Sequence, residues 1–356
     1  QAVDGQQSVA SIVGQLKAEG VGHVIVTSDQ PEKHVGLGVP VHHRDDILEA
    51  QEEMMAHEGV SVLIHDQVCA TEKRRHIKRG KRAPDPALIH IHHDVCEACG
   101  DCSIQSNCVA IEPMATDLGV KRRINQSMCN TDTSCLKGFC PSFISIEGAS
   151  IRKQKGRMGA LDMDALVQNP PAPDWQTIPI HNLVITGVGG TGVMTMSAIC
   201  STAAHLDGLK VASSDVSGLA QKGGAVTSSI KFSLAHDVET GRIIPASAHG
   251  FMACDIVTAT SEDMLTLMSK DRTKLVANAN VAPTKDFIFT RGKEGGKTAP
   301  ARTEFLRSLV SQLKELPAEE ASIKYLGEGM FANMIILGAS WRLGLVPVSR
   351  EALMEA

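Results

Sequence analysis

The feature that most constrains this 356-residue chain is a concentration of cysteine, because seven of its ten cysteines lie between residues 96 and 140. They form two groups: Cys96, Cys99, Cys102 and Cys108, then Cys129, Cys135 and Cys140. In the first group, three cysteines follow each other at two-residue intervals. In the second, the last cysteine stands directly before Pro141. Thiol groups at such spacing indicate a site that needs sulfur ligands.

The spacing matches the cysteine run of two-cluster ferredoxins, in which the fourth cysteine of each run binds the other iron–sulfur cluster. The first cluster is therefore predicted to bind Cys96, Cys99, Cys102 and Cys140. The second is predicted to bind Cys108, Cys129, Asp132 and Cys135. Asp132 stands where the regular run has its middle cysteine, and a carboxylate is a harder ligand than a thiolate. The second cluster is thus expected either as 4Fe-4S with Asp132 on one iron, or as 3Fe-4S.

Two other interpretations of the cysteines are weaker. Zinc sites usually pair two Cys-x2-Cys knuckles across a longer gap, and disulfides need an oxidising compartment, which nothing in the sequence signals. Cys69, Cys200 and Cys254 lie in apolar surroundings and are expected to be small buried side chains. A metal site at His90, His92 and His93 is not favoured.

A glycine-rich turn follows a predicted strand at residues 182–186 and precedes a predicted helix at 193–205. Its glycines, Gly187, Gly189, Gly190 and Gly192, fit the G-x-G-x-x-G pattern that binds dinucleotides, with Asp215 near the ribose position. A second polar, glycine-rich loop contains Ser217, Lys222, Gly223 and Gly224. It is expected at the same carboxyl edge of the sheet, where ligands bind in such folds. From the residues alone, a dinucleotide is favoured as much as the alternatives, which are another phosphate-bearing or anionic ligand and a close subunit contact.

Strand and helix patterns divide the chain into an α/β block before the cysteines and a larger α/β block after them, the latter an open, doubly wound sheet. Further strands of the second block are predicted at 210–213, 225–232, 256–260 and 274–277, and no internal repeat is recognised. Between the blocks, residues 73–82 hold seven Lys or Arg. This run is interpreted as a solvated linker or a surface for an acidic partner. The net charge of −5 and 3% aromatic content do not favour nucleic acid.

In this order, the cysteine groups, the first glycine turn and the segment Gly218-Leu219-Ala220-Gln221-Lys222-Gly223-Gly224 resemble the fused, indolepyruvate-type members of the 2-oxoacid:ferredoxin oxidoreductase family. The resemblance implies five parts. Residues 1–76 would be the end of a thiamine-diphosphate-binding domain, 77–87 a basic linker and 88–150 a ferredoxin-like iron–sulfur domain. Residues 151–178 would be a proline-containing linker, and 179–356 a Rossmann-like gamma domain that does not usually bind NAD.

The resemblance also implies an activity, namely oxidative decarboxylation of an aryl 2-oxoacid to its acyl-CoA with transfer of electrons to ferredoxin. The complete enzyme would use thiamine diphosphate, Mg²⁺ and CoA. The Gly-Asp-Gly…Asn stretch that binds thiamine diphosphate is not found, so the chain is expected to be a fragment, inactive alone, that joins the remaining domains of the enzyme. No catalytic acid or base is assigned, and Ser217 and Lys222 are candidate contacts to thiamine or CoA.

The basic run is then interpreted as a steering surface for an acidic ferredoxin. A cytoplasmic homo-oligomer without membrane or nucleic-acid contacts is expected. Two other functions remain open: an NAD(P)-linked oxidoreductase with a ferredoxin module, and a non-catalytic electron-transfer subunit.

Overall fold

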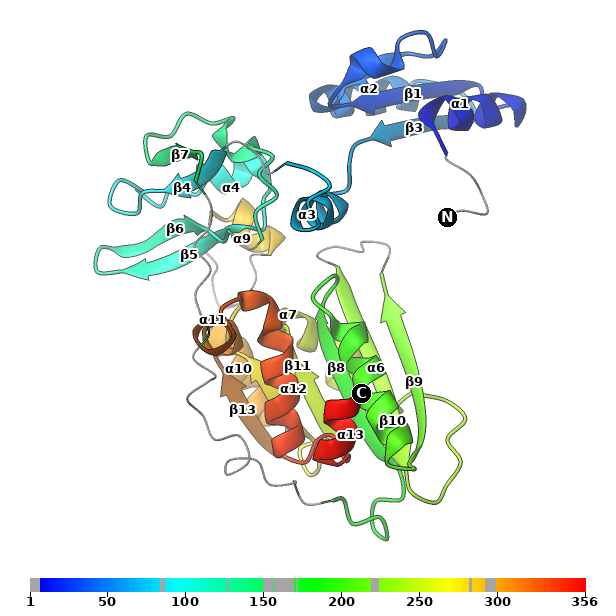
Figure 1. The fold of residues 1–356 in the computed structure, drawn as a ribbon, viewed down its shortest axis with the longest axis vertical. Coiled ribbons are helices and arrows are strands. Elements are labelled where there is room, and N and C mark those ends of the chain that lie inside the picture. Colours follow the sequence, from blue (N-terminus) through cyan, green and yellow to red (C-terminus); the bar gives the residue numbers. More distant parts are fainter. Residues whose placement is uncertain are drawn as a thin grey trace. The chain divides into compact units, whose positions relative to one another are not determined.

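The computed structural model describes residues 7–83, 87–126, 128–149, 156, 170, 172–218, 224–281, 284–291 and 299–356. The chain divides into two compact units, residues 1–85 and 86–356 (Figure 1). The second unit contains two parts, which we call the cysteine module (residues 87–149) and the C-terminal domain (residues 172–356). The proline-containing linker predicted at 151–178 lies largely outside the described residues.

The first unit is a small parallel α/β fold, as its alternating pattern predicts. Its elements are α1 (Val9–Ala18), β1 (His23–Ser28), η1 (Pro31–His34), β2 (Val41–His43), η2 (Arg44–Asp46), α2 (Ile47–Met55), β3 (Ser61–Asp66) and α3 (Ala70–Lys78). The sheet has the order β2-β1-β3, with both pairs parallel. Strand β1 is the central strand and is buried along most of its length because α1 packs Val13 against it. The basic run begins inside α3 rather than in a linker.

The cysteine module consists of two antiparallel strand pairs with the cysteines in the loops between them. Its elements are β4 (Ala87–Ile91), α4 (Asp101–Ser106), β5 (Ile111–Thr116), β6 (Gly119–Ile124), η3 (Ser134–Leu136) and β7 (Phe143–Glu147). Strand β4 pairs with β7 and β5 pairs with β6, so the first strand meets the last. Each half of the module therefore begins and ends beside strands of the other half.

The C-terminal domain is built on a six-stranded sheet with the order β13-β12-β11-β8-β10-β9. The strands are β8 (His181–Val188), β9 (Lys210–Ser217), β10 (Ala225–Ser233), β11 (Gly250–Ala253), β12 (Lys274–Asn278) and β13 (Gln312–Leu316). The helices are α6 (Val193–Leu206), α7 (Ile256–Ala259), α8 (Glu262–Leu267), α9 (Lys285–Phe289), α10 (Ala299–Leu309), α11 (Ala318–Leu326), η5 (Gly329–Phe331), α12 (Ala332–Arg342) and α13 (Arg350–Glu355). Strand β8 is central, and seven of its eight residues are buried.

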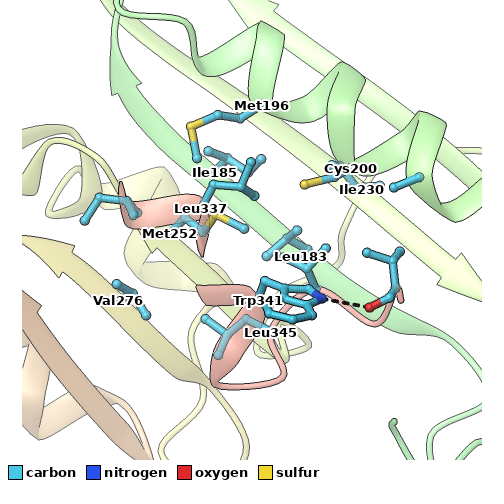
Figure 2. Packing of buried hydrophobic residues seen from close by; sticks show 14 of the residues in the cluster. Leu183, Ile185, Met196, Cys200, Ile230, Met252, Val276, Leu337, Trp341 and Leu345 are labelled. Atoms are coloured by element: carbon cyan, nitrogen blue, oxygen red, sulfur yellow. Dashed lines mark hydrogen bonds between the residues drawn. The ribbon is translucent and has the colours of Figure 1, made fainter. Parts of the chain in front are cut away.

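Helices cover both faces of this sheet, as expected for a doubly wound fold (Figure 1). On one face, α6, α12 and α13 enclose a core that includes Met196, Leu337 and Trp341. On the other, α7 and α10 pack Ile256 and Leu306 over the sheet. Figure 2 shows the first core, where the indole Nε1–H of Trp341 donates a hydrogen bond of 2.8 Å to the Val348 carbonyl. This bond allows the indole to be buried without an unsatisfied donor.

Two expectations about this sheet are wrong. The strand predicted at 256–260 is the helix α7, because Asp255 accepts a hydrogen bond from the Thr258 N–H and caps a helical turn. The strand that precedes it is β11. The sheet is also mixed, because β10 lies between β8 and β9 and is antiparallel to both. An apolar strand pattern gives no information on the direction of its neighbours, and the hairpin from β9 to β10 is what inverts this strand.

Candidate functional site

The two cysteine loops have the same backbone conformation, 33 residues apart in the sequence. In the first, the Ala98 N–H donates to the Cys96 Sγ at 3.4 Å, and in the second the Thr131 N–H donates to the Cys129 Sγ at 3.3 Å. Left-handed φ values recur at equivalent positions, +58° at Ala98 and +52° at Thr131, then +76° at Gly100 and +59° at Thr133. The helix α4 and the 3-10 turn η3 begin at the next residue of each loop. The module is thus an internal repeat, which sequence analysis missed.

The repeat places Asp132 at the position that Cys99 occupies in the first loop. Both residues stand three positions after the first cysteine of their loop and three before the last. Both side chains are exposed. Thr131 and Thr133 adopt conformations that are costly for β-branched residues. The second loop therefore keeps the shape of the first although its sequence lacks both the middle cysteine and the glycine.

Hydrogen bonds between the halves cross the module symmetrically. The Cys96 N–H donates to the His92 carbonyl, and the His92 N–H donates to the Ser142 carbonyl at 2.8 Å. In the other half, the Cys129 N–H donates to the Asn125 carbonyl, and the Asn125 N–H donates to the Ala110 carbonyl at 2.8 Å.

The fourth cysteine of each half stands two residues before the acceptor of this crossing bond. Cys140 precedes Ser142 and Cys108 precedes Ala110 in the sequence. Each fourth cysteine also accepts a backbone hydrogen bond three residues later, from Phe143 and Ile111 respectively, both at 3.3 Å. The crossing therefore ties the chain at Cys140 to the loop of Cys96, and the chain at Cys108 to the loop of Cys129.

The electrostatic neighbours of the thiols divide in the same way. Burial raises the pKa of Cys102 to about 11, and the nearby Cys96 and Cys99 raise it as well. Burial raises the pKa of Cys135 to about 11, with contributions from Cys129, Cys108 and Asp132. Cys108 has its pKa raised by burial and by Asp132 and Cys129. The structure thus brings Cys108, Cys129, Asp132 and Cys135 together and keeps Cys108 with the second loop.

A buried arginine lies beside the first group. Arg122 on β6 is 3% exposed. Its Nη2–H donates to the Arg291 carbonyl at 2.9 Å, and its Cζ lies 4.7 Å from the centroid of the Phe287 ring. Its Nε has no hydrogen-bond partner, and within the described residues no carboxylate pairs with it. A buried guanidinium without a counter-ion is costly. The negative charge of metal-bound thiolates would compensate it, so the surroundings of the first group fit an iron–sulfur cluster.

Strand β6 also joins the cysteine module to the C-terminal domain. Beyond the contact of Arg122 with Arg291 and Phe287, the Asn125 Nδ2 donates to Glu112 at 2.7 Å and to Glu319 at 3.1 Å. A Cβ added to Gly100 would lie 2.8 Å from the Arg291 Cβ. This close approach explains why the first loop needs glycine where the second has Thr133. The cysteine module therefore contacts the C-terminal domain through Arg122, Asn125 and Gly100.

The two glycine-rich loops of the C-terminal domain meet at one edge of the sheet. The Gly189 N–H donates to the Gly224 carbonyl at 2.7 Å. In the first turn, Gly190 and Gly192 have φ values of +86° and +93°. A Cβ at Gly187 would lie 2.6 Å from the Val193 Cγ2, so α6 packs directly against this turn. From α12, Asn333 donates to the Thr191 carbonyl at 2.8 Å and holds the turn in place.

Several predicted residues are not brought to this edge in the expected way. Lys222 and Gly223 lie outside the described residues, and Ser217 is exposed at the end of β9. Asp215 is exposed on β9, which is separated from the glycine turn on β8 by the whole of β10. In a dinucleotide fold, the acid that binds the ribose follows the strand next to the glycine turn. The inserted strand therefore weighs against a dinucleotide here.

The remaining cysteines and histidines give mixed outcomes. Cys200 and Cys254 are buried as expected, and burial raises both pKa values to about 12. Cys69 is exposed before α3, so its expected burial is wrong; it precedes the first turn of a polar helix. In the described part of the chain, no three His, Cys, Asp or Glu side chains surround one point closely enough to hold a single metal ion. A cluster differs from a single ion because its thiolates bind different irons.

None of the helices in the described ranges has the length and apolar character needed to cross a membrane.

Comparison with known proteins connects the C-terminal domain to one family. Residues 182–356 match the model of the pyruvate ferredoxin/flavodoxin oxidoreductase family. The chain is 28% identical over 177 residues to the indolepyruvate oxidoreductase subunit IorB of Methanothermobacter thermautotrophicus, covering 49% of this chain and 85% of that protein. It is 24% identical over 187 residues to the IorB subunit of Pyrococcus horikoshii, covering 49% and 83%.

Solved structures also align with about half of the chain. The PORC subunit of pyruvate oxidoreductase from Thermotoga maritima gives a TM-score of 0.35 at 20% identity, over 50% of this chain and 83% of that one. The 2-oxoglutarate:ferredoxin oxidoreductase of Magnetococcus marinus gives a TM-score of 0.38 at 16% identity, over 50% of this chain and 26% of that one.

Proposed function

We propose, from the premise that residues 182–356 form a domain of the pyruvate ferredoxin/flavodoxin oxidoreductase family, that this chain is the electron-transfer part of a 2-oxoacid:ferredoxin oxidoreductase. The similarity to IorB subunits favours an aryl 2-oxoacid such as indolepyruvate as the substrate. In that enzyme the oxoacid is decarboxylated oxidatively to an acyl-CoA, and ferredoxin accepts the electrons. Thiamine diphosphate, Mg²⁺ and CoA would be used by the assembled enzyme together with its other domains.

The observation that carries this proposal is the internal repeat of the cysteine module. In the proposed assignment, each half offers three ligands from its own loop and takes the fourth from the other half, and the backbone bonds between the halves support this pairing. The first ligand set is Cys96, Cys99, Cys102 and Cys140. The second set is Cys108, Cys129, Asp132 and Cys135. Iron–sulfur clusters bound there would supply carriers that accept one electron at a time.

The residues of this chain have distinct tasks in the proposed enzyme. The loops fix the spacing of the thiolates, and the contact through β6 fixes the module against the C-terminal domain. The glycine turn at residues 187–192 leads into the N-terminus of α6, which suits an anionic ligand. We propose that Ser217 and Lys222 are contacts near the thiamine or CoA site.

Anaerobic reconstitution with iron and sulfide tests the proposal directly. The full chain should take up two clusters, with matching iron and acid-labile sulfide contents and two electron paramagnetic resonance signals after reduction. A chain that takes up zinc and no sulfide would refute the iron–sulfur assignment.

The variant Asp132→Cys tests the second ligand set. Because Asp132 takes the place of Cys99 in the repeat, a cysteine there should complete four thiolate ligands and make the second cluster a stable 4Fe-4S cluster. Asp117→Cys is the matched control, since it adds a thiol in the exposed turn between β5 and β6. If iron content and spectra of Asp132→Cys equal those of the wild type, Asp132 is not a ligand.

A further inference from the structure

The two ligand sets lie in different electrostatic surroundings although their loops repeat each other. Beside the first set, the Lys121 Nζ donates to the Cys96 carbonyl at 2.8 Å, and Arg122 is buried without a carboxylate partner in the described part of the chain. In the second set, Asp132 stands in place of a thiolate and carries the same single negative charge. Near that set, Arg123 is neutralised by Glu112, with Nη2 and Oε2 3.1 Å apart. The net positive charge is thus placed on the side of the first set.

Two contacts hold the Arg122 guanidinium, one to the Arg291 carbonyl and one to the Phe287 ring. The Arg122 Nη2 donates to the Arg291 carbonyl at 2.9 Å. The same carbonyl oxygen would lie 3.3 Å from a Cβ added to Gly100 of the first loop. Gly100 lies between Cys99 and Cys102 in the sequence. The Phe287 ring of α9 packs on the guanidinium, which adds a cation–π contact. The guanidinium therefore cannot move to solvent without breaking the contact between the module and the C-terminal domain.

We propose that Arg122 is a positioning residue that raises the reduction potential of the first cluster and ties that cluster to the C-terminal domain. This inference rests on the proposed function, because it requires clusters at both ligand sets. Reduction adds negative charge to a cluster that its thiolates already make negative. A buried positive charge therefore stabilises the reduced form, and burial keeps that interaction from being screened by water.

The consequence concerns where an electron resides within the chain. With Arg122 in place, the first cluster is reduced more easily than it would be beside a neutral side chain. Arg122 therefore shifts an electron shared between the two clusters toward the first cluster, beside the family domain.

The test is a redox titration of the full chain, reconstituted with iron and sulfide and followed by electron paramagnetic resonance. The change in spectrum of Asp132→Cys identifies the signal of the second cluster, and the other signal is the first. Arg122→Gln should lower the midpoint potential of the first cluster by about 59 mV. For a one-electron couple, this corresponds to about a tenfold change in the ratio of reduced to oxidised cluster. The second signal should stay where it is.

Two further variants separate charge from packing. Arg122→Lys keeps the positive charge and should keep most of the potential, although it loses the fork that binds Arg291. Arg123→Gln removes the same charge one residue along β6 from an exposed ion pair and should leave the first cluster unchanged.

The inference is overturned if Arg122→Gln leaves both potentials unchanged, or if Arg123→Gln lowers the first potential equally. It is also overturned if Arg122→Lys and Arg122→Gln both lose the first cluster, since Arg122 would then be structural only. Failure of the wild type to take up iron and sulfide would refute the proposed function, and this inference with it. Uptake without a shift in Arg122→Gln refutes the inference alone.

Discussion

Replacing His181 with glutamine should remove much of the acid sensitivity of the C-terminal domain. His181 begins β8, is 5% exposed and has its Nε2 3.0 Å from the Leu345 carbonyl. Burial, with smaller contributions from the stacked His249 and the nearby Lys274, lowers the pKa of His181 to about 4. In the folded domain the imidazole is therefore neutral at every pH above about 4.

The magnitude follows from the difference between the folded and unfolded states. An unfolded histidine has a pKa of about 6.5, so below that pH the unfolded chain binds a proton that the folded domain does not. Stability is then fully present above pH 6.5 and is lost as pH falls toward the folded pKa. Between about pH 7.5 and about pH 5 the loss is about 2 kcal/mol, at 1.36 kcal/mol per pH unit below the unfolded pKa. His249, whose pKa is also lowered by burial, adds to the same trend.

Chemical denaturation followed by tryptophan fluorescence measures this domain selectively. Both tryptophans of the chain, Trp175 and Trp341, pack in the core under α6 and α12. His181→Gln keeps a donor for the Leu345 carbonyl and cannot be protonated. Between about pH 7.5 and about pH 5, the free energy of unfolding of this variant should therefore fall about 2 kcal/mol less than that of the wild type. His205→Gln, at an exposed position in the last turn of α6, is the control. If His181→Gln shows the same pH dependence as the wild type, the burial argument is wrong.

Two further predictions concern the edge of the sheet and the contact with the module. Gly187→Ala should destabilise the C-terminal domain by about 1–3 kcal/mol in the same denaturation assay, because its Cβ would lie 2.6 Å from Val193. Gly338→Ala in α12 is the control, because no atom lies within 4 Å of its new Cβ, and it should raise the free energy of unfolding by about 0.5–1 kcal/mol. If the two variants change the free energy of unfolding equally, the packing argument is wrong. Glu319→Gln should raise the melting temperature at neutral pH. Burial and the charge of Glu112 raise the pKa of Glu319, so its ionised form opposes folding increasingly as pH rises, whereas glutamine still accepts from Asn125. A lower melting temperature for Glu319→Gln would show that the negative charge is needed.

Sequence spacing was a good guide to local structure in this chain. The strand, glycine turn and helix from residue 181 to 206 lie where the pattern predicts them, because apolar runs and glycines act on their immediate neighbours. The grouping of Cys108 with the second loop follows the predicted ligand set. Asp132 was singled out by its spacing alone. The metal-binding roles of these residues stay predictions.

Local substitutions hide two features of this chain from its sequence pattern. Asp132, Thr131 and Thr133 replace the residues that would mark the internal repeat, while the bond from the Thr131 N–H to the Cys129 Sγ keeps the loop shape. The apolar run of the helix α7 is too short to show a helical period, so its pattern predicts a strand.

The sequence by itself determined which side chains are available: seven closely spaced thiols, one carboxylate in register with them, and two glycine-rich loops. Only the tertiary structure decided what they face. It inserted β10 between the glycine turn and Asp215, and it buried Arg122 against the Phe287 ring and the Arg291 carbonyl. Strand order and the burial of a charge depend on contacts between segments far apart in the chain, and spacing along the sequence carries no record of them.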